Sequence, residues 1–308
     1  MKIVITGGAG FIGSNLARTL MDRPGISQIR VIDNLSTGHK ENIAGLDVLF
    51  FEGDIQDAAL LKQAFRDADA IVHLAALPSV PRSVKDPIAS HHANATGTLQ
   101  VLEAARRAGN LHVIAASSSS VYGANPHLPK HEDLTTAPMS PYAVTKLATE
   151  AYLVAYHHSF GLPVLPFRFF NVYGPGQRAD HPYAAVIPKW ISAMLDGRPV
   201  TVHGDGTQTR DFTYVGTVCE VLADALLRRV DEPWPVNLAF GTRTSLLDLI
   251  PEIEAAIGFR AQRQHTADRV GDVPHSQADS TRLRALFPTI WPTPLQEGIP
   301  ATANWLRA

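Results

Sequence analysis

A short apolar strand followed by a cluster of glycines constrains the fold of this chain more than any other stretch. Residues 3–6, Ile-Val-Ile-Thr, are typical of a buried parallel strand, which the following glycines end in a turn. Gly7, Gly10 and Gly13 have the spacing that permits a tight turn, a close backbone approach to a ligand and close helix packing. The N-terminus of the next helix would offer free N–H groups to a pyrophosphate. The stretch therefore predicts a dinucleotide-binding loop.

An acidic residue further along the chain agrees with this interpretation. A second apolar strand, 28–32, ends at Asp33, where a carboxylate can accept hydrogen bonds from an adenosine ribose. Asn34 follows where an enzyme that uses NADP would be expected to carry an arginine, and Asp33 would repel a 2′-phosphate. NAD is therefore the predicted cofactor.

Strand and helix patterns alternate through the first half of the chain. Strands are expected at 47–51, 70–76 and 111–116, and helices at 58–65 and 96–108. This order predicts right-handed βαβ units and an α/β fold with a doubly wound, mostly parallel sheet. Prolines and glycines after about residue 172 indicate shorter elements. We expect an NAD-binding domain over 1–172, with a returning segment near 211–241 that includes a strand at 236–239, and a smaller, mainly substrate-binding domain over 173–308.

Composition narrows the classes of function. The chain has 308 residues, a formal net charge of −2 and a pI of about 6.7, so it carries no electrostatic signature of binding to nucleic acid or to an anionic membrane. No apolar run is long enough for a membrane span, and the first residues enter a strand without a signal segment. We expect a cytoplasmic protein. The single cysteine, Cys219, lies among apolar neighbours and is expected to be an inert core thiol.

Two stretches contain the candidate catalytic residues. Strand 111–116 runs into four serines, 117–120, at the edge where open α/β sheets bind ligands. Tyr142 and Lys146 are four residues apart and share one face of a predicted helix. A lysine ammonium beside a phenol lowers the phenol pKa, and the positive nicotinamide ring acts in the same direction. Tyr142 is therefore the predicted base.

Together these motifs resemble the extended short-chain dehydrogenase/reductase family, specifically its nucleotide-sugar epimerases. The likeness covers nearly the whole chain and includes further matching stretches at 167–175, 204–212 and 269–272. The resemblance implies a Rossmann-like fold, bound NAD and a UDP-sugar substrate. Arg210 and Arg269 can each bind phosphate in a bidentate manner, and Asp272 can accept a hydrogen bond from a ribose hydroxyl.

The resemblance also implies two sets of contact residues. The expected cofactor contacts are Gly7, Gly10, Phe11, Ile12, Gly13, Asp33, Asn34, Ser36, Thr37, Gly38, Asp54, Ile55, Leu74, Ala75, Ala76, Asn94, Ser117, Tyr142, Lys146 and Phe169. The expected substrate contacts are Ser79, Val80, Ser118, Ser119, Tyr142, Asn171, Ala185, Val186, Val202, His203, Arg210, Arg269, Asp272 and Ser276. For Asp54 a second interpretation stays open, because a carboxylate just before a helix also suits an N-cap.

The residues after Ser118 distinguish between reactions. Nucleotide-sugar 4,6-dehydratases carry an acidic pair where this chain has Ser119 and Ser120, and UDP-glucuronate decarboxylases usually have a glutamate there. The remaining reaction is epimerisation at C4, with Ser118 bridging the sugar O4 and Tyr142. The Tyr142 phenolate takes the O4 proton while C4 gives a hydride to NAD, and the 4-keto sugar then receives the hydride on its other face.

The sugar is less well defined by the sequence. The stretches 79–83, 125–130 and 183–189 resemble epimerases that act on UDP-N-acetylglucosamine as well as UDP-glucose, whereas 117–122 also resembles UDP-glucuronate 4-epimerases. The latter usually have threonine in place of Asn171, which favours the neutral sugars. Ser276 is small where family members that exclude N-acetyl groups have tyrosine, so acetylated sugars are expected to be accepted. An exposed loop serine is the alternative interpretation of Ser276.

Other classes of function fit the sequence less well. A catalytically silent NAD-binding regulator on the same fold would be expected to have lost Tyr142 or Lys146. The adjacent pairs His91-His92 and His157-His158 lack metal-ligand spacing and are expected to be exposed helix residues. No metal site is predicted.

A homodimer is predicted from one helix. Apolar residues of the helix expected at 142–160 are too widely spread for a single core-facing stripe. We therefore expect this helix and the one at 96–108 to pack against their symmetry mates, as in family members that dimerise.

Overall fold

The computed structural model describes residues 1–180, 184–267 and 274–307. The chain forms two compact units, and each consists of several segments. Unit 1 comprises Met1–Gly123, Thr135–Phe169 and Cys219–Val236, and unit 2 comprises Ala124–Leu134, Phe170–Val218 and Asn237–Ala308. None of the described helices is long and apolar enough to cross a membrane.

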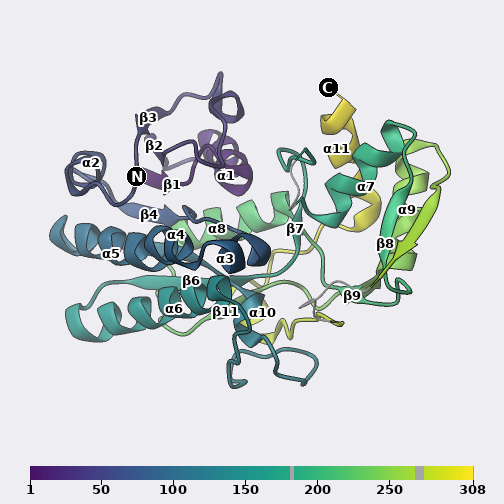
Figure 1. Ribbon diagram of the computed structural model, residues 1–308. Helices are drawn as coiled ribbons and strands as arrows, with labels where there is room; N and C mark the ends of the chain where they lie inside the picture. Colours follow the sequence, from purple (N-terminus) through teal and green to yellow (C-terminus); the bar gives the residue numbers. More distant parts are fainter. Residues whose placement is uncertain (181–183, 268–273, 308) are drawn as a thin grey trace. The chain divides into compact units, whose positions relative to one another are not determined.

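Unit 1 is built on a seven-stranded sheet with the order β11-β6-β5-β4-β1-β2-β3 (Figure 1). The strands of this sheet are β1 (Lys2–Thr6), β2 (Gln28–Asp33), β3 (Leu49–Glu52), β4 (Ala70–His73), β5 (His112–Ser118), β6 (Val164–Phe169) and β11 (Val236–Leu238), and of β11 only the first residue is assigned to unit 1. Neighbouring strands from β3 to β6 pair in parallel. The order reverses at β1, which confirms the predicted doubly wound sheet. The strand expected at 236–239 does return to this sheet as β11.

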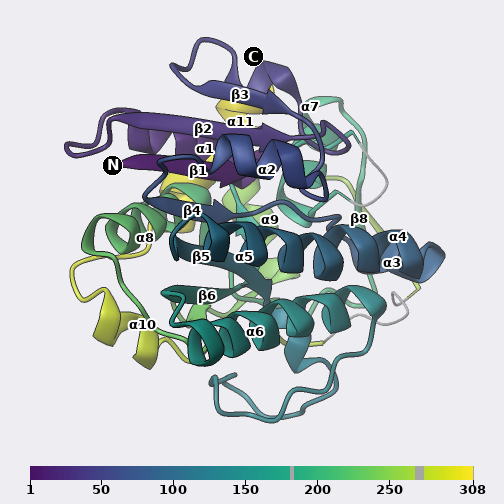
Figure 2. The same cartoon turned by 90° about the vertical axis from the view of Figure 1, so that its left-hand side faces the viewer.

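Helices connect the strands of unit 1. They are α1 (Phe11–Met21), α2 (Ala58–Ala64), α3 (Val80–Lys85), α4 (Pro87–His91), α5 (Gly97–Arg107), α6 (Pro141–Phe160) and the C-terminal part of α8 (Val215–Arg228), with the short turns η1 (Lys40–Ile43), η2 (His92–Thr96) and η3 (Ser119–Tyr122). Figure 2 shows α2, α5 and α6 on the same side of the sheet. Leu61, Val101 and Leu153 from these three helices pack in one core cluster with Val4 and Val113 of the strands.

The boundaries of these elements follow local signals in the sequence. Ser140 caps α6 by accepting a hydrogen bond from the Ala143 N–H, and Pro141 begins the helix, where a missing N–H costs nothing. Gly161 ends the helix in the left-handed conformation. The helix expected at 96–108 is α5, which continues from the π-helical turn η2.

Unit 2 consists of shorter elements. Its helices are α7 (Val186–Leu195), α9 (Leu246–Ile257), α10 (Thr281–Leu286), α11 (Leu295–Arg307) and the first turn of α8, and its strands are β7 (Val172–Tyr173), β8 (Val200–His203), β9 (Thr209–Arg210), β10 (Thr213–Tyr214), β12 (Thr244–Ser245) and β13 (Arg263–Thr266). The strands form three separate pairs: β10 with β7, β12 with β9, and β13 with β8. Unit 2 has its own core cluster, which includes Trp190 of α7, Leu249 of α9 and Ile299 of α11.

Candidate active site

The glycine-rich loop between β1 and α1 has room for backbone atoms only. A Cβ atom at Gly13 would lie 2.3 Å from the Gly7 carbonyl oxygen, and one at Gly7 would lie 2.7 Å from the Ala75 nitrogen. Gly7 also has φ +70°, which favours glycine. Gly10 precedes α1, and no side chain caps this helix end. The loop therefore suits a dinucleotide phosphate held by the N–H groups of the first helical turn.

Asp33 stands at the end of β2 beside this loop. Its carboxylate accepts hydrogen bonds from the Ala9 N–H at 3.0 Å and the Leu35 N–H at 2.8 Å. Burial raises the pKa of Asp33, and these two bonds oppose the rise. A Cβ atom at Gly38 would come within 2.8 Å of the carboxylate, so the following loop packs directly against it. Asp33 is thus placed where a ribose would be expected.

The two interpretations of Asp54 can now be separated. Asp57, not Asp54, caps α2 by accepting hydrogen bonds from the backbone N–H groups of Ala59 and Leu60. Asp54 accepts a hydrogen bond from the Asn34 side-chain amide at 2.8 Å. Asn34 and Asp54, both predicted cofactor residues, therefore contact each other just beyond the ends of β2 and β3.

The candidate catalytic residues gather where β5 meets the first turns of α6. The Tyr142 phenol makes a side-chain hydrogen bond with Ser118, and the Lys146 Nζ donates to the Ala116 carbonyl oxygen at 2.7 Å. Burial raises the pKa of Tyr142, and the bond with Ser118 opposes this rise. The net pKa of Tyr142 is raised because the cost of burying a phenolate prevails, and the lowering by Lys146 and the nicotinamide ring stays a prediction. Burial also lowers the pKa of Lys146 to about 8.

A buried polar network lies behind these residues, and sequence reasoning found only part of it. Asn94, a predicted cofactor residue in η2, donates to the Thr145 hydroxyl at 3.0 Å, and that hydroxyl donates to the Tyr142 carbonyl oxygen. His73 was not predicted: it bonds the hydroxyls of Thr6 at 2.7 Å and Thr98 at 3.0 Å. The sequence signal that could have indicated His73 is a histidine within an otherwise apolar strand.

The remaining predicted residues of unit 1 line loops and strand ends. Ser79 caps α3 with φ +105°, a strained value for a residue other than glycine. Val80 begins that helix and is partly exposed. The other predicted contacts in this unit are Phe11, Ile12, Ser36, Thr37, Ile55, Leu74, Ala75, Ala76, Ser119 and Phe169, which lie on α1, on η3, at the end of β6 or in the loops that follow strands.

Unit 2 contains a pocket of about 250 Å³. Five predicted substrate residues line it: Asn171, Ala185, Val186, His203 and Arg210. Further lining residues outside the predicted substrate contacts include Lys189, Trp190, Thr201, Gln208 and Phe212. A pocket with an arginine, a lysine, a histidine and aromatic rings has the chemistry to hold a nucleoside diphosphate.

Val202 and Ser276 were also predicted to contact substrate. Val202 is fully buried in the core of unit 2, whereas its neighbours on β8, Thr201 and His203, line the pocket. Alternation along the strand explains the difference. The Ser276 N–H donates to the Thr209 carbonyl oxygen at 3.0 Å, one residue from Arg210. Arg269 and Asp272 lie outside the described residues.

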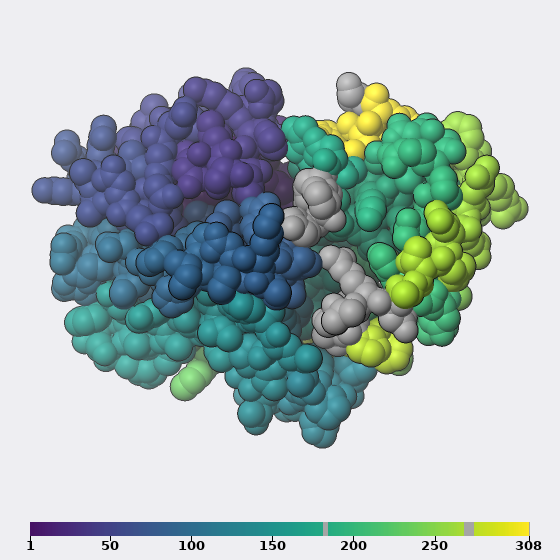
Figure 3. All heavy atoms as spheres, viewed as in Figure 1, coloured from purple at the N-terminus to yellow at the C-terminus, as the bar shows by residue number. Residues whose placement is uncertain are grey.

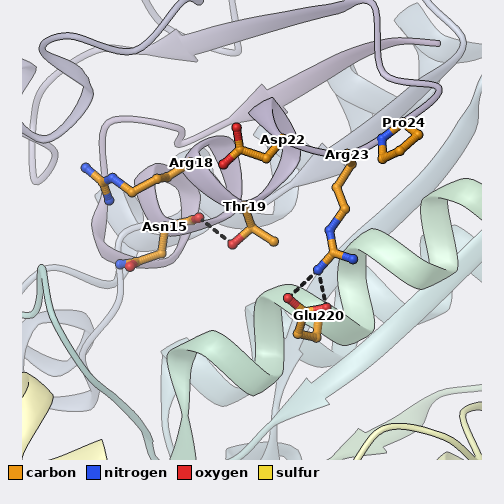
Figure 4. A pocket seen from close by; sticks show the side chains of 7 residues that line it. All are labelled: Asn15, Arg18, Thr19, Asp22, Arg23, Pro24 and Glu220. Atoms are coloured by element: carbon orange, nitrogen blue, oxygen red, sulfur yellow. Dashed lines mark hydrogen bonds and ion pairs between the residues drawn. The ribbon is translucent and has the colours of Figure 1, made fainter.

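A second pocket, in unit 1, has different chemistry (Figure 4). It measures about 470 Å³ and is lined by Asn15, Arg18, Thr19, Asp22, Arg23, Pro24 and Glu220. Arg23 is paired with Glu220, and the pocket lies at the C-terminal half of α1, where the helix dipole disfavours an anion. Nearby Cys219 is a buried core thiol as expected, and burial raises its pKa to about 12.

The described histidines and carboxylates form no metal centre. Within residues 1–180, 184–267 and 274–307, no group of three or more histidine, cysteine, aspartate or glutamate side chains could hold a metal ion. His91, His92 and His158 are exposed helix residues as expected, whereas His157 is half-buried and donates from Nδ1 to the Leu162 carbonyl oxygen at 3.1 Å.

A doubly wound sheet, a glycine loop that only backbone can fill, and a tyrosine and lysine on one helix face together define a dinucleotide-dependent enzyme of the Rossmann type. Residues 3–239 match the model of the NAD dependent epimerase/dehydratase family, and the chain belongs to this family. NAD, the predicted cofactor, is thereby confirmed.

Several relatives match along their whole length. The UDP-glucose 4-epimerase of Mycolicibacterium smegmatis is 37% identical over 318 residues, covering 100% of this chain and 99% of the relative. The solved UDP-N-acetylglucosamine 4-epimerase of Methanobrevibacter ruminantium, in complex with UDP-N-acetylmuramic acid, has a TM-score of 0.93 at 36% identity, covering 99% and 98% of the two chains. The UDP-glucuronic acid 4-epimerase of Bacillus cereus, with UDP-glucuronic acid and NAD, has a TM-score of 0.89 at 33% identity, covering 100% and 99%.

Proposed function

We propose that this chain inverts the configuration at C4 of a UDP-hexose, with UDP-glucose and UDP-N-acetylglucosamine as its substrates. The observation that carries the proposal is the arrangement of Tyr142 and Lys146 on one face of α6, with Ser118 of β5 hydrogen-bonded to the phenol. Relatives named as 4-epimerases of UDP-sugars support it.

Each unit has its own part in this proposal. Unit 1 binds NAD through the loop of Gly7, Gly10 and Gly13 and through Asp33. Unit 2 holds the nucleoside diphosphate in its pocket, where the Arg210 guanidinium can bind phosphate oxygens. Binding energy from the nucleotide then serves to position the sugar, which is the reacting part.

The mechanism follows from the residues of unit 1. Tyr142 accepts the proton from the O4 hydroxyl of the sugar and later returns it to the 4-keto sugar, while the Ser118 hydroxyl orients the phenol. The Lys146 ammonium stabilises the phenolate, whose formation burial opposes. Bound NAD would supply the hydride acceptor, a positive charge near the phenol, and, once reduced, the hydride donor.

Asn171 favours the neutral hexoses as substrates, because the resembling UDP-glucuronate 4-epimerases usually have threonine at this position. Its side-chain amide donates to the Asp211 carbonyl oxygen at 3.1 Å, so the residue is held in the lining of the unit 2 pocket. UDP-glucuronate is the second candidate substrate, because a UDP-glucuronic acid 4-epimerase is among the similar structures. The stretch 117–122, which resembles UDP-glucuronate 4-epimerases, favours this second candidate.

The test is a direct comparison of substrates. Purified protein is incubated separately with UDP-glucose, UDP-N-acetylglucosamine and UDP-glucuronate, and the products are resolved by chromatography. Interconversion with the corresponding 4-epimers is expected for the first two sugars, and Tyr142→Phe is the inactive control. Conversion of UDP-glucuronate alone would replace the proposed substrates, and conversion of none would reject the proposal.

The proposal includes a homodimer through α5 and α6. The face of α6 away from the sheet carries Val144, which is 51% exposed, and the exposed Ala151 and Ala155. Apolar side chains exposed along one helix face are typical of an interface between copies. A mass measured by light scattering at micromolar concentration should be twice that of the chain, and a monomer would contradict this part.

A further inference from the structure

A buried ion pair lies one helical turn beyond Lys146. Both oxygens of Glu150 on α6 accept hydrogen bonds from Arg168 on β6, at 2.9 Å from Nε and 2.8 Å from Nη2. Each of the two side chains is 4% exposed. Burying such a pair is costly and is not by itself a source of stability, so its position beside the reacting residues is the informative feature.

Ser117 connects this pair to the end of the central strand. Its hydroxyl donates to Glu150 Oε1 at 2.5 Å and lies 3.4 Å from the Lys146 carbonyl oxygen. Ser117 and Arg168 are direct partners in the parallel register of β5 and β6. Glu150 is therefore held by two neighbouring strands at the same level of the sheet.

The Glu150 carboxylate lies on the same face of α6 as the proposed catalytic residues. Tyr142, Lys146 and Glu150 follow at intervals of four residues and share one helix face. Lys146 is buried and its Nζ donates to a neutral acceptor, the Ala116 carbonyl oxygen. Desolvation lowers the pKa of Lys146, and the negative charge of Glu150 opposes this.

Other titratable or charged groups lie near Lys146 or contact Glu150. His73 of β4 is neutral, because burial and the nearby Lys146 charge lower its pKa to about 3. Burial raises the pKa of the Tyr142 phenol of α6, and the positive charge of bound NAD would be expected to lower it. Arg168 of β6 is positive and lies with its guanidinium 4.7 Å from the centre of the Tyr122 ring of η3. Among these groups, Glu150 supplies the negative charge.

We propose that Glu150 is a positioning residue for the reaction: its carboxylate, fixed by Arg168 and Ser117, keeps Lys146 in the charged form that stabilises the Tyr142 phenolate. This inference rests on the proposed roles of Tyr142 and Lys146. Glu150 itself has no contact with substrate in this account and acts through the lysine.

The test measures the titration of Lys146 directly. Protein labelled with ¹³C at the lysine Cε is titrated by NMR, and the Lys146 resonance is identified by its loss in Lys146→Arg. In Glu150→Gln the midpoint should fall by roughly one pH unit, as expected when a nearby opposite charge is removed. Glu220→Gln is the matched control, because it makes the same change at an ion pair with Arg23 away from the site. It should leave the midpoint unchanged.

A second variant keeps the test decisive if Glu150→Gln does not fold. Glu150→Gln/Arg168→Met removes both charges, so no buried arginine is left unpaired, and the midpoint should again fall, by less than in the single variant. In both variants the alkaline limb of the pH profile of kcat/KM should move to lower pH with the midpoint. If Glu150 had a purely structural role, the variants would change activity without moving the Lys146 midpoint or the alkaline limb. An unchanged midpoint in a folded variant overturns the inference.

The readouts separate this inference from the proposed function. The NMR titration needs no substrate, so it reports on Glu150 and Lys146 even if no UDP-hexose is converted. Loss of the proposed function would appear as an inactive wild type or an active Tyr142→Phe, neither of which alters the NMR result.

Discussion

The two units hold their candidate functional residues in different ways. In unit 1, Tyr142, Lys146 and Glu150 come from one helix, and the end of β5 supplies partners to all three. In unit 2, the pocket is assembled from separate short elements, and its lining residue Asn171 is held by donating to the carbonyl oxygen of Asp211. The Asp211 carboxylate is itself buried and accepts hydrogen bonds from the N–H groups of Gly241 and Ala278. The proposed chemistry therefore lies on continuous, rigid elements, whereas the proposed substrate binding is distributed over many short ones.

The largest expected effect concerns unit 1. Tyr142→Phe removes the only group proposed to exchange a proton with O4, so kcat should fall by about 10²–10⁴-fold while the fold and NAD binding are retained. Steady-state kinetics with UDP-glucose and a circular dichroism spectrum check both expectations. Retention of more than about a tenth of the wild-type rate would refute the assignment of Tyr142 as the base.

A change in unit 2 should instead alter which substrate is used. The resemblance to epimerases places Ser276 beside the C2 substituent of the hexose, where a bulky side chain would clash with an N-acetyl group. Ser276→Tyr should lower kcat/KM for UDP-N-acetylglucosamine by about 10–200-fold and spare UDP-glucose. The measurement is kcat/KM for each sugar in both proteins. A wild type inactive on the acetylated sugar, or equal loss on both sugars, would show that Ser276 is not the gate.

The different construction of the units also explains what the sequence could predict. The glycine loop, Asp33 and the Tyr142–Lys146 spacing are local patterns, and local patterns can be identified without knowing the fold. The register that pairs Ser117 with Arg168, and the burial that raises the pKa of Tyr142, arise from residues far apart in sequence. The sequence alone could not show that the Val202 side chain is buried while its neighbours on β8 line the pocket, because which face of β8 is buried depends on packing in unit 2.

The buried network of unit 1 predicts a dependence of stability on pH. The pKa of His73 is lowered from 6.5 to about 3 in the fold, so the unfolded chain binds a proton there first as the pH falls. Its contribution is complete above about pH 6.5 and is progressively lost between about pH 6.5 and 3. Between pH 7.5 and 5 the loss should be about 2 kcal/mol.

His73→Gln isolates this contribution. The variant has no imidazole to protonate, so its free energy of unfolding should depend less steeply on pH than that of the wild type. Urea unfolding at several pH values measures the difference between the two proteins. Parallel pH dependences in both would show that His73 does not titrate in this way.

The smallest expected effect tests whether unit 2 acts by binding alone. Arg210 donates through Nη1 to the carbonyl oxygens of Thr209 at 2.9 Å and Pro274 at 3.3 Å, so the backbone orients its guanidinium at the pocket. Arg210→Lys keeps the positive charge but loses the planar, bidentate donor, so KM should rise about tenfold, equivalent to about 1.4 kcal/mol, with kcat nearly unchanged. A matched change at Arg228, an exposed arginine paired with Asp224, should leave both constants unaltered. If Arg210→Lys lowered kcat as strongly as Tyr142→Phe, the division of labour between a reacting unit and a binding unit would be wrong, because a residue of the pocket would then stabilise the transition state more than the bound substrate.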